Sequence, residues 1–241
     1  MRVRDFPSDL KDRFGSRSNA LPPATLRERV GIDSARQHFE DVGRAASADI
    51  VNAVKDAGFE GTSYRRWLDF GCGAGRVARH FTNAHVIGIQ LTGADIDATA
   101  IRWCTGHLRG EFVVVKPDPP TPFADHSFDV IYVVSVFTHF NEEQQFAWLA
   151  ELRRILRPGG VLVATTQGEH LTYNRPDMTT ENHRALQDHG FVFRHGFGDF
   201  NEESAFHTRA YLERAWSNYF SMVKFTRGGL AGYLDLSIWT R

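Results

Sequence analysis

The 241-residue chain has only two cysteines and no uninterrupted apolar run long enough to cross a membrane. Two cysteines, Cys72 and Cys104, make neither a disulfide framework nor a metal cluster, so both are expected to be small buried groups in a reducing compartment. The first residues are charged and no apolar segment follows them, which predicts that there is no signal peptide. These absences favour a cytoplasmic protein.

An excess of one sign of charge is also missing. The chain has 28 Lys and Arg against 29 Asp and Glu, which gives a formal net charge of −1 at pH 7. Because nucleic-acid-binding proteins usually present a basic face, we expect no nucleic-acid partner. The lack of a long apolar run likewise predicts no membrane partner. No group of acidic residues and histidines has the spacing of metal ligands, so no catalytic metal is expected. The sequence leaves the oligomeric state open.

The most informative stretch runs from Trp67 to Arg76, where an apolar strand is followed by glycines at alternate positions. Such glycines permit a tight turn and let the backbone approach a ligand, and the start of the next helix attracts an anion. Asp69 would repel the pyrophosphate of a nicotinamide dinucleotide, and Arg76 stands where the dinucleotide fingerprint has its third glycine. S-adenosylmethionine fits better, because it offers an ammonium group to the carboxylate.

Short apolar runs alternate with helical patterns along the middle of the chain. Alternation of this kind predicts a doubly wound, parallel α/β sheet. The expected strands are Arg66–Phe70, Leu91–Ala94, Glu111–Val115, Val130–Val134 and Val161–Thr165. Helices are expected from a cap at Asp97 to about His107 and over Glu142–Leu156. A competing second strand, His85–Ile89, would place Gln90 rather than Asp95 at the ligand.

The sequence predicts four parts. Residues 1–62 form an N-terminal helical cap, in which Ser47 caps a helix that Gly58 ends. Residues 63–170 form the cofactor-binding core, and residues 171–218 form a lid or substrate insertion with a short strand near 190–196 and a helix capped by Thr208. Residues 219–241 form a C-terminal hairpin with strands at 220–225 and 233–239.

Four motifs in the expected order resemble the class I S-adenosylmethionine-dependent methyltransferases that act on small molecules. They lie at 67–81, 93–104, 122–131 and 152–162. The resemblance implies a Rossmann-like, mostly parallel seven-stranded sheet with helices on both faces and one antiparallel strand near the C-terminus. It also implies methyl transfer from S-adenosylmethionine, which leaves S-adenosylhomocysteine, to a small acceptor such as a sugar or a natural product.

Two carboxylates are the leading cofactor ligands, Asp69 for the ammonium group and Asp95 for the ribose hydroxyls. Asp118 is expected to hold the adenine amino group, with the backbone of Val115 and Lys116 as the alternative. The other cofactor-binding residues expected are Phe70, Gly71, Cys72, Gly73, Gly75, Arg76, Ile96 and Ser135.

An oxygen acceptor needs a general base with a pKa near neutrality, and histidine suits this role. His139 follows the fourth strand and is the first candidate, although it is equally interpreted as a helix cap or a packing residue. His207 is the second candidate and His170 the third. Three other functions stay open: methylation at nitrogen, cofactor binding without catalysis, and NAD(P)-dependent oxidoreduction.

Overall fold

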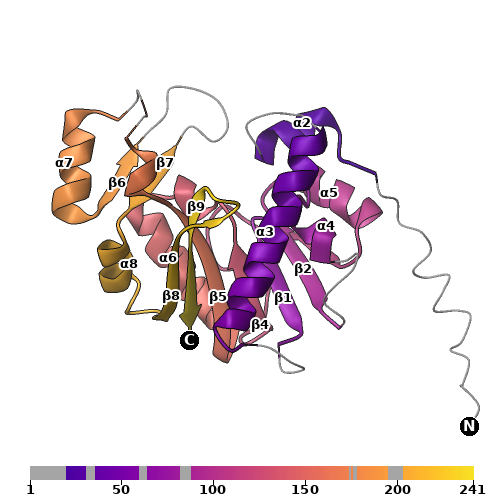
Figure 1. Cartoon of the computed structure of the whole chain (residues 1–241). Coiled ribbons are helices and arrows are strands. Elements are labelled where there is room, and N and C mark those ends of the chain that lie inside the picture. Colours follow the sequence, from indigo (N-terminus) through magenta and orange to yellow (C-terminus); the bar gives the residue numbers. More distant parts are fainter. Residues whose placement is uncertain are drawn as a thin grey trace, which may run out of the picture.

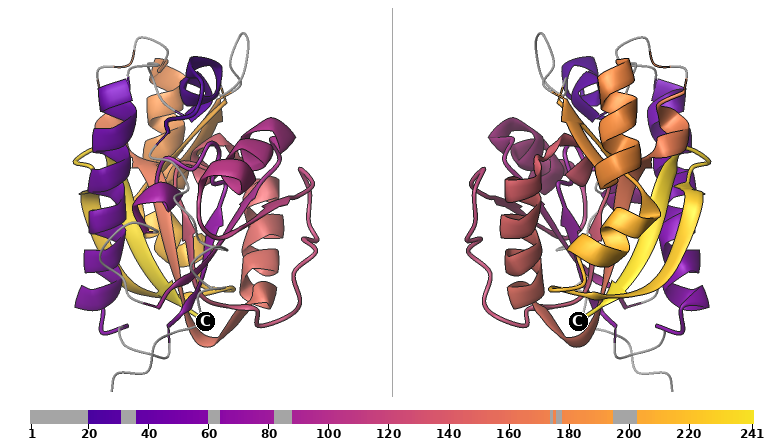
Figure 2. Two further views of the ribbon diagram at one scale, coloured as in Figure 1. Left: turned by 90° about the vertical axis from the view of Figure 1, so that its right-hand side faces the viewer. Right: turned by 90° about the vertical axis from the view of Figure 1, so that its left-hand side faces the viewer.

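The computed structural model describes residues 20–30, 36–59, 64–81, 88–173, 175, 178–194 and 203–241. In this part of the chain, helices cover both faces of a central sheet, as Figure 1 and the side views in Figure 2 show. The α/β class predicted from the sequence is therefore confirmed. The alternative strand at His85–Ile89 falls largely outside the described residues.

Seven strands form the main part of the sheet, in the order β3-β2-β1-β4-β5-β9-β8. Strands β1 to β5 run parallel, β9 lies antiparallel to β5, and β8 pairs antiparallel with β9. Their bounds are β1 Arg66–Phe70, β2 Gln90–Asp95, β3 Glu111–Val114, β4 Phe128–Val133, β5 Leu156–Gly168, β8 Ser221–Leu230 and β9 Leu234–Thr240. The expected seven-stranded sheet with one antiparallel strand near the C-terminus is thus present.

Two further strands enlarge this sheet to nine among the described residues. β6 (Phe191–Arg194) and β7 (Ser204–His207) form an antiparallel pair. Strand β5 continues past the end of β4, so Gln167 and Gly168 pair in parallel with β7. The sequence predicts a strand near β6 but not β7, because four residues carry too little periodicity to be recognised.

The helices divide between the two faces. One face carries α3 (Arg36–Asp56), α4 (Ala78–Phe81) and α5 (Ala98–His107), and the other carries α6 (Glu142–Ile155) and α8 (Arg209–Ala215). Figure 2 shows α3 and α6 on opposite sides of the strands. The remaining elements are α2 (Ala24–Arg27), η1 (Glu28–Val30), η2 (Phe137–His139), η3 (Glu169–Leu171) and α7 (Thr180–His189).

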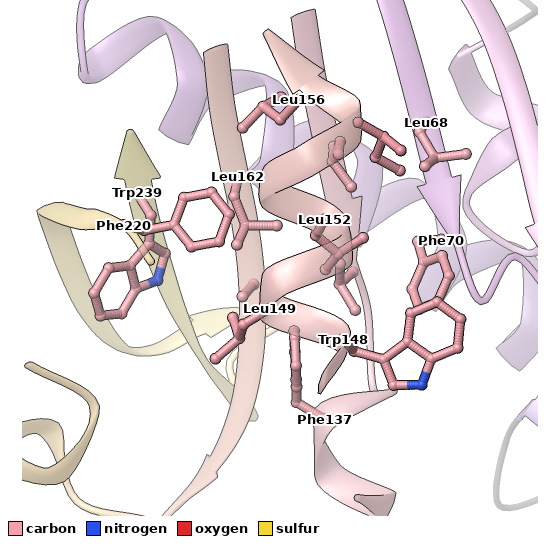
Figure 3. Packing of buried hydrophobic residues seen from close by; sticks show 14 of the residues in the cluster. Leu68, Phe70, Phe137, Trp148, Leu149, Leu152, Leu156, Leu162, Phe220 and Trp239 are labelled. Carbon is pink, nitrogen blue, oxygen red and sulfur yellow. The ribbon is translucent and has the colours of Figure 1, made fainter. Parts of the chain in front are cut away.

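Alternation along the central strands explains why both faces are covered. On β4, Val130 and Tyr132 pack with side chains of α3, whereas Ile131 and Val133 pack with side chains of α6. All four residues are 0% exposed. Figure 3 shows the hydrophobic cluster on the α6 face, in which α6 lies against β1 and β5. A strand buried on both faces is a continuous apolar run, which is why β4 is visible in the sequence.

Two of the three predicted helix caps are confirmed. The side chains of Asp97 and Thr208 accept hydrogen bonds from backbone N–H groups in the first turns of α5 and α8. The prediction for Ser47 is wrong, because α3 runs through it and its hydroxyl donates to the carbonyl of Arg44. The helix does end before Gly58, which has a φ of +84°.

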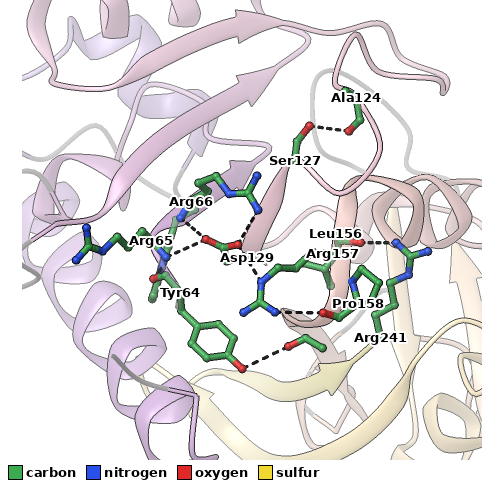
Figure 4. A network of polar contacts seen from close by, with 12 residues as sticks. Tyr64, Arg65, Arg66, Ala124, Ser127, Asp129, Leu156, Arg157, Pro158 and Arg241 are labelled. Atoms are coloured by element: carbon green, nitrogen blue, oxygen red, sulfur yellow. Dashed lines mark hydrogen bonds and ion pairs between the residues drawn. The ribbon is translucent and has the colours of Figure 1, made fainter. Parts of the chain in front are cut away.

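Asp129 ties the beginning of β1 to the beginning of β5, as Figure 4 shows. Its Oδ2 atom accepts hydrogen bonds from the backbone N–H groups of Arg65 and Arg66 at 2.9 and 2.8 Å. Its Oδ1 atom accepts from the side chains of Arg66 and Arg157 at 2.8 and 2.9 Å. Burial alone would raise the pKa of Asp129, but the hydrogen bonds from Arg66 and Arg65 hold it below its usual value.

Asp129→Ala is expected to lower the free energy of unfolding by about 1–3 kcal/mol, because partly buried donors lose a buried, charged acceptor. The folded-state pKa lies below the unfolded value of about 3.9, so this contribution is present above that pH and is lost as the pH falls through the folded value. Urea unfolding near neutral pH and in acid measures both effects. Asp125→Ala is the control, because Asp125 pairs with Arg154 but is 67% exposed. Equal losses in the two variants would contradict this account.

Candidate functional site

A cavity of about 880 Å³ opens at the carboxyl ends of β1, β2 and β4. Parallel α/β sheets bind their ligands at this edge. The glycine loop after β1 and the loop after β4 form its floor. Residues of α3 and of the turn between β8 and β9 form much of the opposite wall. The cavity is therefore lined both by the first motif, at 67–81, and by two segments without a motif, α3 and the β8–β9 turn.

The glycine loop has the left-handed backbone conformations that glycine adopts more readily than other residues. Gly71, Gly73 and Gly75 have φ values of +79°, +50° and +75°. A Cβ atom on Gly71 would collide with Val136, and one on Gly75 would collide with Leu108 at the end of α5. Gly71 and Gly73 line the cavity, but Gly75 is not among its lining residues. Gly75 thus lets the loop pack on α5 rather than on a ligand.

Asp69 lies near the end of β1 and lines the cavity, although it is only 2% exposed. Its Oδ2 atom has no hydrogen-bond partner within the described part of the chain. Burial raises the pKa of Asp69 to about 7, an effect that Tyr132 and Arg76 partly oppose. A buried carboxylate oxygen without a partner, facing a cavity, suits a cationic ligand. The residues present therefore fit an ammonium group.

The neighbours of Asp69 in the first motif also reach the cavity. Phe70, Cys72 and Arg76 line it. Burial lowers the pKa of the Arg76 guanidinium, and the nearby Asp69 carboxylate opposes that shift. Cys72 and Cys104 are buried free thiols, as predicted, and both lie within hydrogen-bond distance of the Gly73 carbonyl.

Asp95 ends β2 beside the glycine loop. Its Oδ2 atom accepts a hydrogen bond from the Gly73 N–H at 2.7 Å, and its Oδ1 atom accepts from the Asp97 N–H at 2.8 Å. Burial raises its pKa, and these backbone N–H groups oppose the shift. Gln90 begins the same strand at its opposite end and is exposed. The structure thus favours Asp95 over Gln90 as the residue at the ligand.

The structure does not bring Asp118 to the site. Asp118 is exposed and is not among the residues that line the cavity. Val115 and Pro117 line it instead, in the segment after β3, and Ile96 lines it from the residue after β2 with 53% of its surface exposed. The proline-rich segment carries residue 118 away from the sheet edge, so the backbone alternative at Val115 is the better supported.

Ser135 and His139 both line the cavity from the loop after β4. Ser135 has a φ of +60°, an uncommon conformation for a residue with a side chain, and its N–H donates to Thr165 at 2.8 Å. The Nδ1 atom of His139 lies 2.8 Å from the carbonyl of Glu203. Because a carbonyl only accepts, Nδ1 carries the proton, and Nε2 of the neutral ring keeps its lone pair. Burial lowers the pKa of His139, which favours this neutral form.

His207 and His170 are not among the lining residues. His207 is 1% exposed, its Nε2 atom lies 2.9 Å from the side-chain nitrogen of buried Gln145, and burial lowers its pKa to about 3. His170 directs its Nε2 atom to the Tyr233 carbonyl at 3.1 Å. Both rings therefore lie outside the cavity, where they contact neighbouring elements. This position corrects the expectation that His207 or His170 is the general base.

Several lining residues carry no signal in the sequence. Arg29 lines the cavity and makes an ion pair at 2.5 Å with Asp97, which follows β2. His38 and Val42 of α3 and Tyr233 of the β8–β9 turn line the other side. These residues come from opposite ends of the chain, so only the fold brings them together.

Within the ranges that the structure describes, no group of three or more His, Cys, Asp or Glu side chains is placed to hold a metal ion. None of the helices described has the length and apolar character needed to span a membrane.

Comparisons with known proteins match this geometry. The profile of the methyltransferase-domain family matches residues 68–164. Sterol 24-C-methyltransferase ERG6B of Gibberella zeae is 34% identical over 98 residues, which cover 39% of this chain and 25% of that protein. Probable tRNA methyltransferase 9B of Mus musculus is 28% identical over 122 residues, which cover 49% of this chain and 26% of that protein. The chain thus spans about a quarter of the length of these two relatives.

A solved structure extends the likeness to the whole chain. Burkholderia thailandensis 1,6-didemethyltoxoflavin-N1-methyltransferase, with bound 1,6-didemethyltoxoflavin and S-adenosylhomocysteine, aligns with a TM-score of 0.59. It is 15% identical, and the alignment covers 100% of this chain and 92% of that one. At this identity the likeness concerns the fold. The family match itself runs from β1 into β5 and includes the glycine loop and the loop after β4, which form the floor of the cavity. Residues 68–164 therefore match the methyltransferase-domain family, and the fold around them is that of solved methyltransferases.

Proposed function

We propose that the chain transfers a methyl group from S-adenosylmethionine to an oxygen atom of a small molecule. The observation that carries this proposal is the buried Asp69 carboxylate, which faces the cavity beside the glycine loop with one oxygen unpartnered. A pyrophosphate is a poor ligand for such a site, because a second anion would be repelled in a medium of low dielectric. An ammonium group is a good one.

Different residues around the glycine loop bind different parts of the cofactor in this proposal. Asp69 binds its ammonium group, and Asp95 accepts hydrogen bonds from its ribose hydroxyls. Asp95 is already fixed by the N–H groups of Gly73 and Asp97, so its remaining lone pairs are held in place before the ligand arrives. Ile96 and Val115 give the adenine an apolar wall. The bound cofactor supplies an activated methyl group on a sulfonium ion.

The rest of the cavity suits a small acceptor with an apolar body. Val42 and Ala46 of α3 and Leu230 and Leu234 of the β8–β9 hairpin contribute apolar side chains to its wall. Small-molecule sites are typically apolar with a few placed polar groups. The insertion of residues 171–218 contributes Arg175, Glu203 and Ser204 among its described residues, which supports its proposed role in holding the acceptor.

His139 is the proposed general base for an oxygen acceptor. Its Nδ1 atom is held by the Glu203 carbonyl, so Nε2 is the atom that takes a proton. Holding the acceptor and the base in one cavity that excludes water supplies much of the remaining rate by alignment. A nitrogen acceptor needs no such base when the amine is neutral, and this alternative is separated by the His139 variant discussed below.

Sugars and natural products are the proposed acceptors, because the four motifs resemble those of methyltransferases that act on small molecules. We expect the protein, incubated with methyl-labelled S-adenosylmethionine and a fractionated extract of small metabolites, to label a small molecule detectable by mass spectrometry. Total tRNA incubated in parallel is expected to stay unlabelled. Label in tRNA alone would contradict the small-molecule acceptor. Cofactor binding without label in any fraction would favour a non-catalytic binding protein.

A further inference from the structure

Two buried polar atoms without hydrogen-bond partners lie on neighbouring strands beneath the cofactor loop. Asp69 on β1 and Tyr132 on β4 are paired in register, so their side chains project from the same face of the sheet. Asp69 is 2% exposed and Tyr132 0% exposed. Among the described residues, neither Asp69 Oδ2 nor the Tyr132 hydroxyl makes a hydrogen bond. Buried polar groups are nearly always paired, so two exceptions on neighbouring strands, one of them on a residue that lines the cavity, call for a functional explanation.

The position of Tyr132 is fixed by its packing. Its ring lies 5.1 Å from the ring of Phe81 and 6.3 Å from that of Trp67, between β1 and α4. A hydroxyl on a ring held in this way contributes nothing to the apolar cluster around it. A phenylalanine would fill the same space without burying a polar atom. The polar neighbour of this hydroxyl is the Asp69 carboxylate, because the two residues are paired in register, and Tyr132 lowers the pKa of that carboxyl.

We propose that Tyr132 is a positioning residue for the cofactor, whose hydroxyl stabilises the ionised form of the Asp69 carboxylate. This inference rests on the proposed role of Asp69 in binding the cofactor's ammonium group. Only the ionised carboxylate attracts an ammonium group, and burial opposes ionisation at this position. Tyr132 acts through Asp69 and does not itself touch the reacting atoms.

Besides Tyr132, three neighbouring groups influence the pKa of Asp69. Arg76 of the glycine loop and the backbone N–H of Ala78 favour its ionised form, whereas Asp95 of β2 disfavours it. Burial is the largest influence and raises the pKa of Asp69 to about 7, and the Tyr132 hydroxyl is the strongest of the groups that oppose this rise. Removing the hydroxyl is therefore expected to raise the pKa of Asp69 further and to favour its protonated form.

The test is the pH dependence of S-adenosylhomocysteine binding, measured by calorimetry from about pH 6 to about pH 8.5. In the wild type, affinity is expected to fall about tenfold towards the acidic end as Asp69 becomes protonated. In Tyr132→Phe the midpoint of this fall is expected to move up by about one pH unit, while the affinity at the alkaline end changes less than about twofold. Asp69→Asn is expected to bind weakly with no such midpoint.

Tyr64→Phe is the matched control, because its hydroxyl contacts the Gly159 carbonyl at 3.4 Å and does not line the cavity. This variant is expected to keep the wild-type profile. A second hydroxyl-free variant, Tyr132→Leu, is expected to shift the midpoint in the same direction, which separates the hydroxyl from the ring. An unchanged midpoint in folded Tyr132→Phe, or an equal loss of affinity at every pH, would overturn the inference. Failure of the wild type to bind S-adenosylhomocysteine at any pH would instead contradict the proposed function.

Discussion

Replacing His139 by glutamine is expected to lower kcat for an oxygen acceptor by about 10²–10⁴-fold, the usual contribution of a general base. The affinity for S-adenosylhomocysteine should change by only a few fold, because His139 lies after β4, whereas Asp69 and Asp95 lie at the ends of β1 and β2. Initial rates at saturating cofactor, together with calorimetric binding, measure the two effects separately.

The pH dependence of kcat adds a signature that a purely structural role would not give. The base acts as the neutral imidazole, so kcat falls as the pH falls through the pKa of His139. Burial lowers that pKa, and the acidic limb should therefore lie below the usual histidine value of about 6.5. His207→Gln is the control, because His207 is buried away from the cavity. A His139 variant with normal turnover would point to a nitrogen acceptor or to a packing role.

Asp95→Ala is expected to weaken S-adenosylhomocysteine binding by about 1–3 kcal/mol, or roughly 5- to 150-fold, because charge-assisted hydrogen bonds to the ribose are lost. The loss has a second source, since Asp95 also holds the Gly73 N–H and hence the glycine loop. Calorimetric titration measures the affinity, and thermal unfolding shows whether the variant is folded.

Gln90→Ala is the matched control on the same strand. Gln90 is exposed at the amino end of β2, so its truncation should change the affinity by much less. A larger effect at Gln90 than at Asp95 would mean that the cofactor does not lie at the carboxyl end of this strand.

The sequence predicts the central strands and the glycine loop well, because both depend on local patterns. A run such as residues 128–133 is apolar at nearly every position, which only a strand buried on both faces requires. The glycines at 71, 73 and 75 occupy backbone conformations that other residues avoid. Asp97 caps its helix through bonds within a few residues, so its role is also visible locally.

The errors concern features that depend on the distant parts of the fold. Asp118 follows the third strand in the sequence, but the turn that it belongs to leaves the sheet edge. His207 lies in β7, which pairs with β6 and with the extension of β5, and it is buried there. Arg29 and Tyr233 reach the cavity only because the N-terminal helices and the C-terminal hairpin close over the same edge. No local pattern could have identified them.

The most direct test of the account is calorimetric titration of the intact chain with S-adenosylhomocysteine and, separately, with NAD⁺. The account predicts saturable binding of S-adenosylhomocysteine that Asp69→Asn weakens, and no heat of binding with NAD⁺, because the buried carboxylate favours an ammonium group and repels a pyrophosphate. Saturable binding of NAD⁺ with no response to S-adenosylhomocysteine would contradict it.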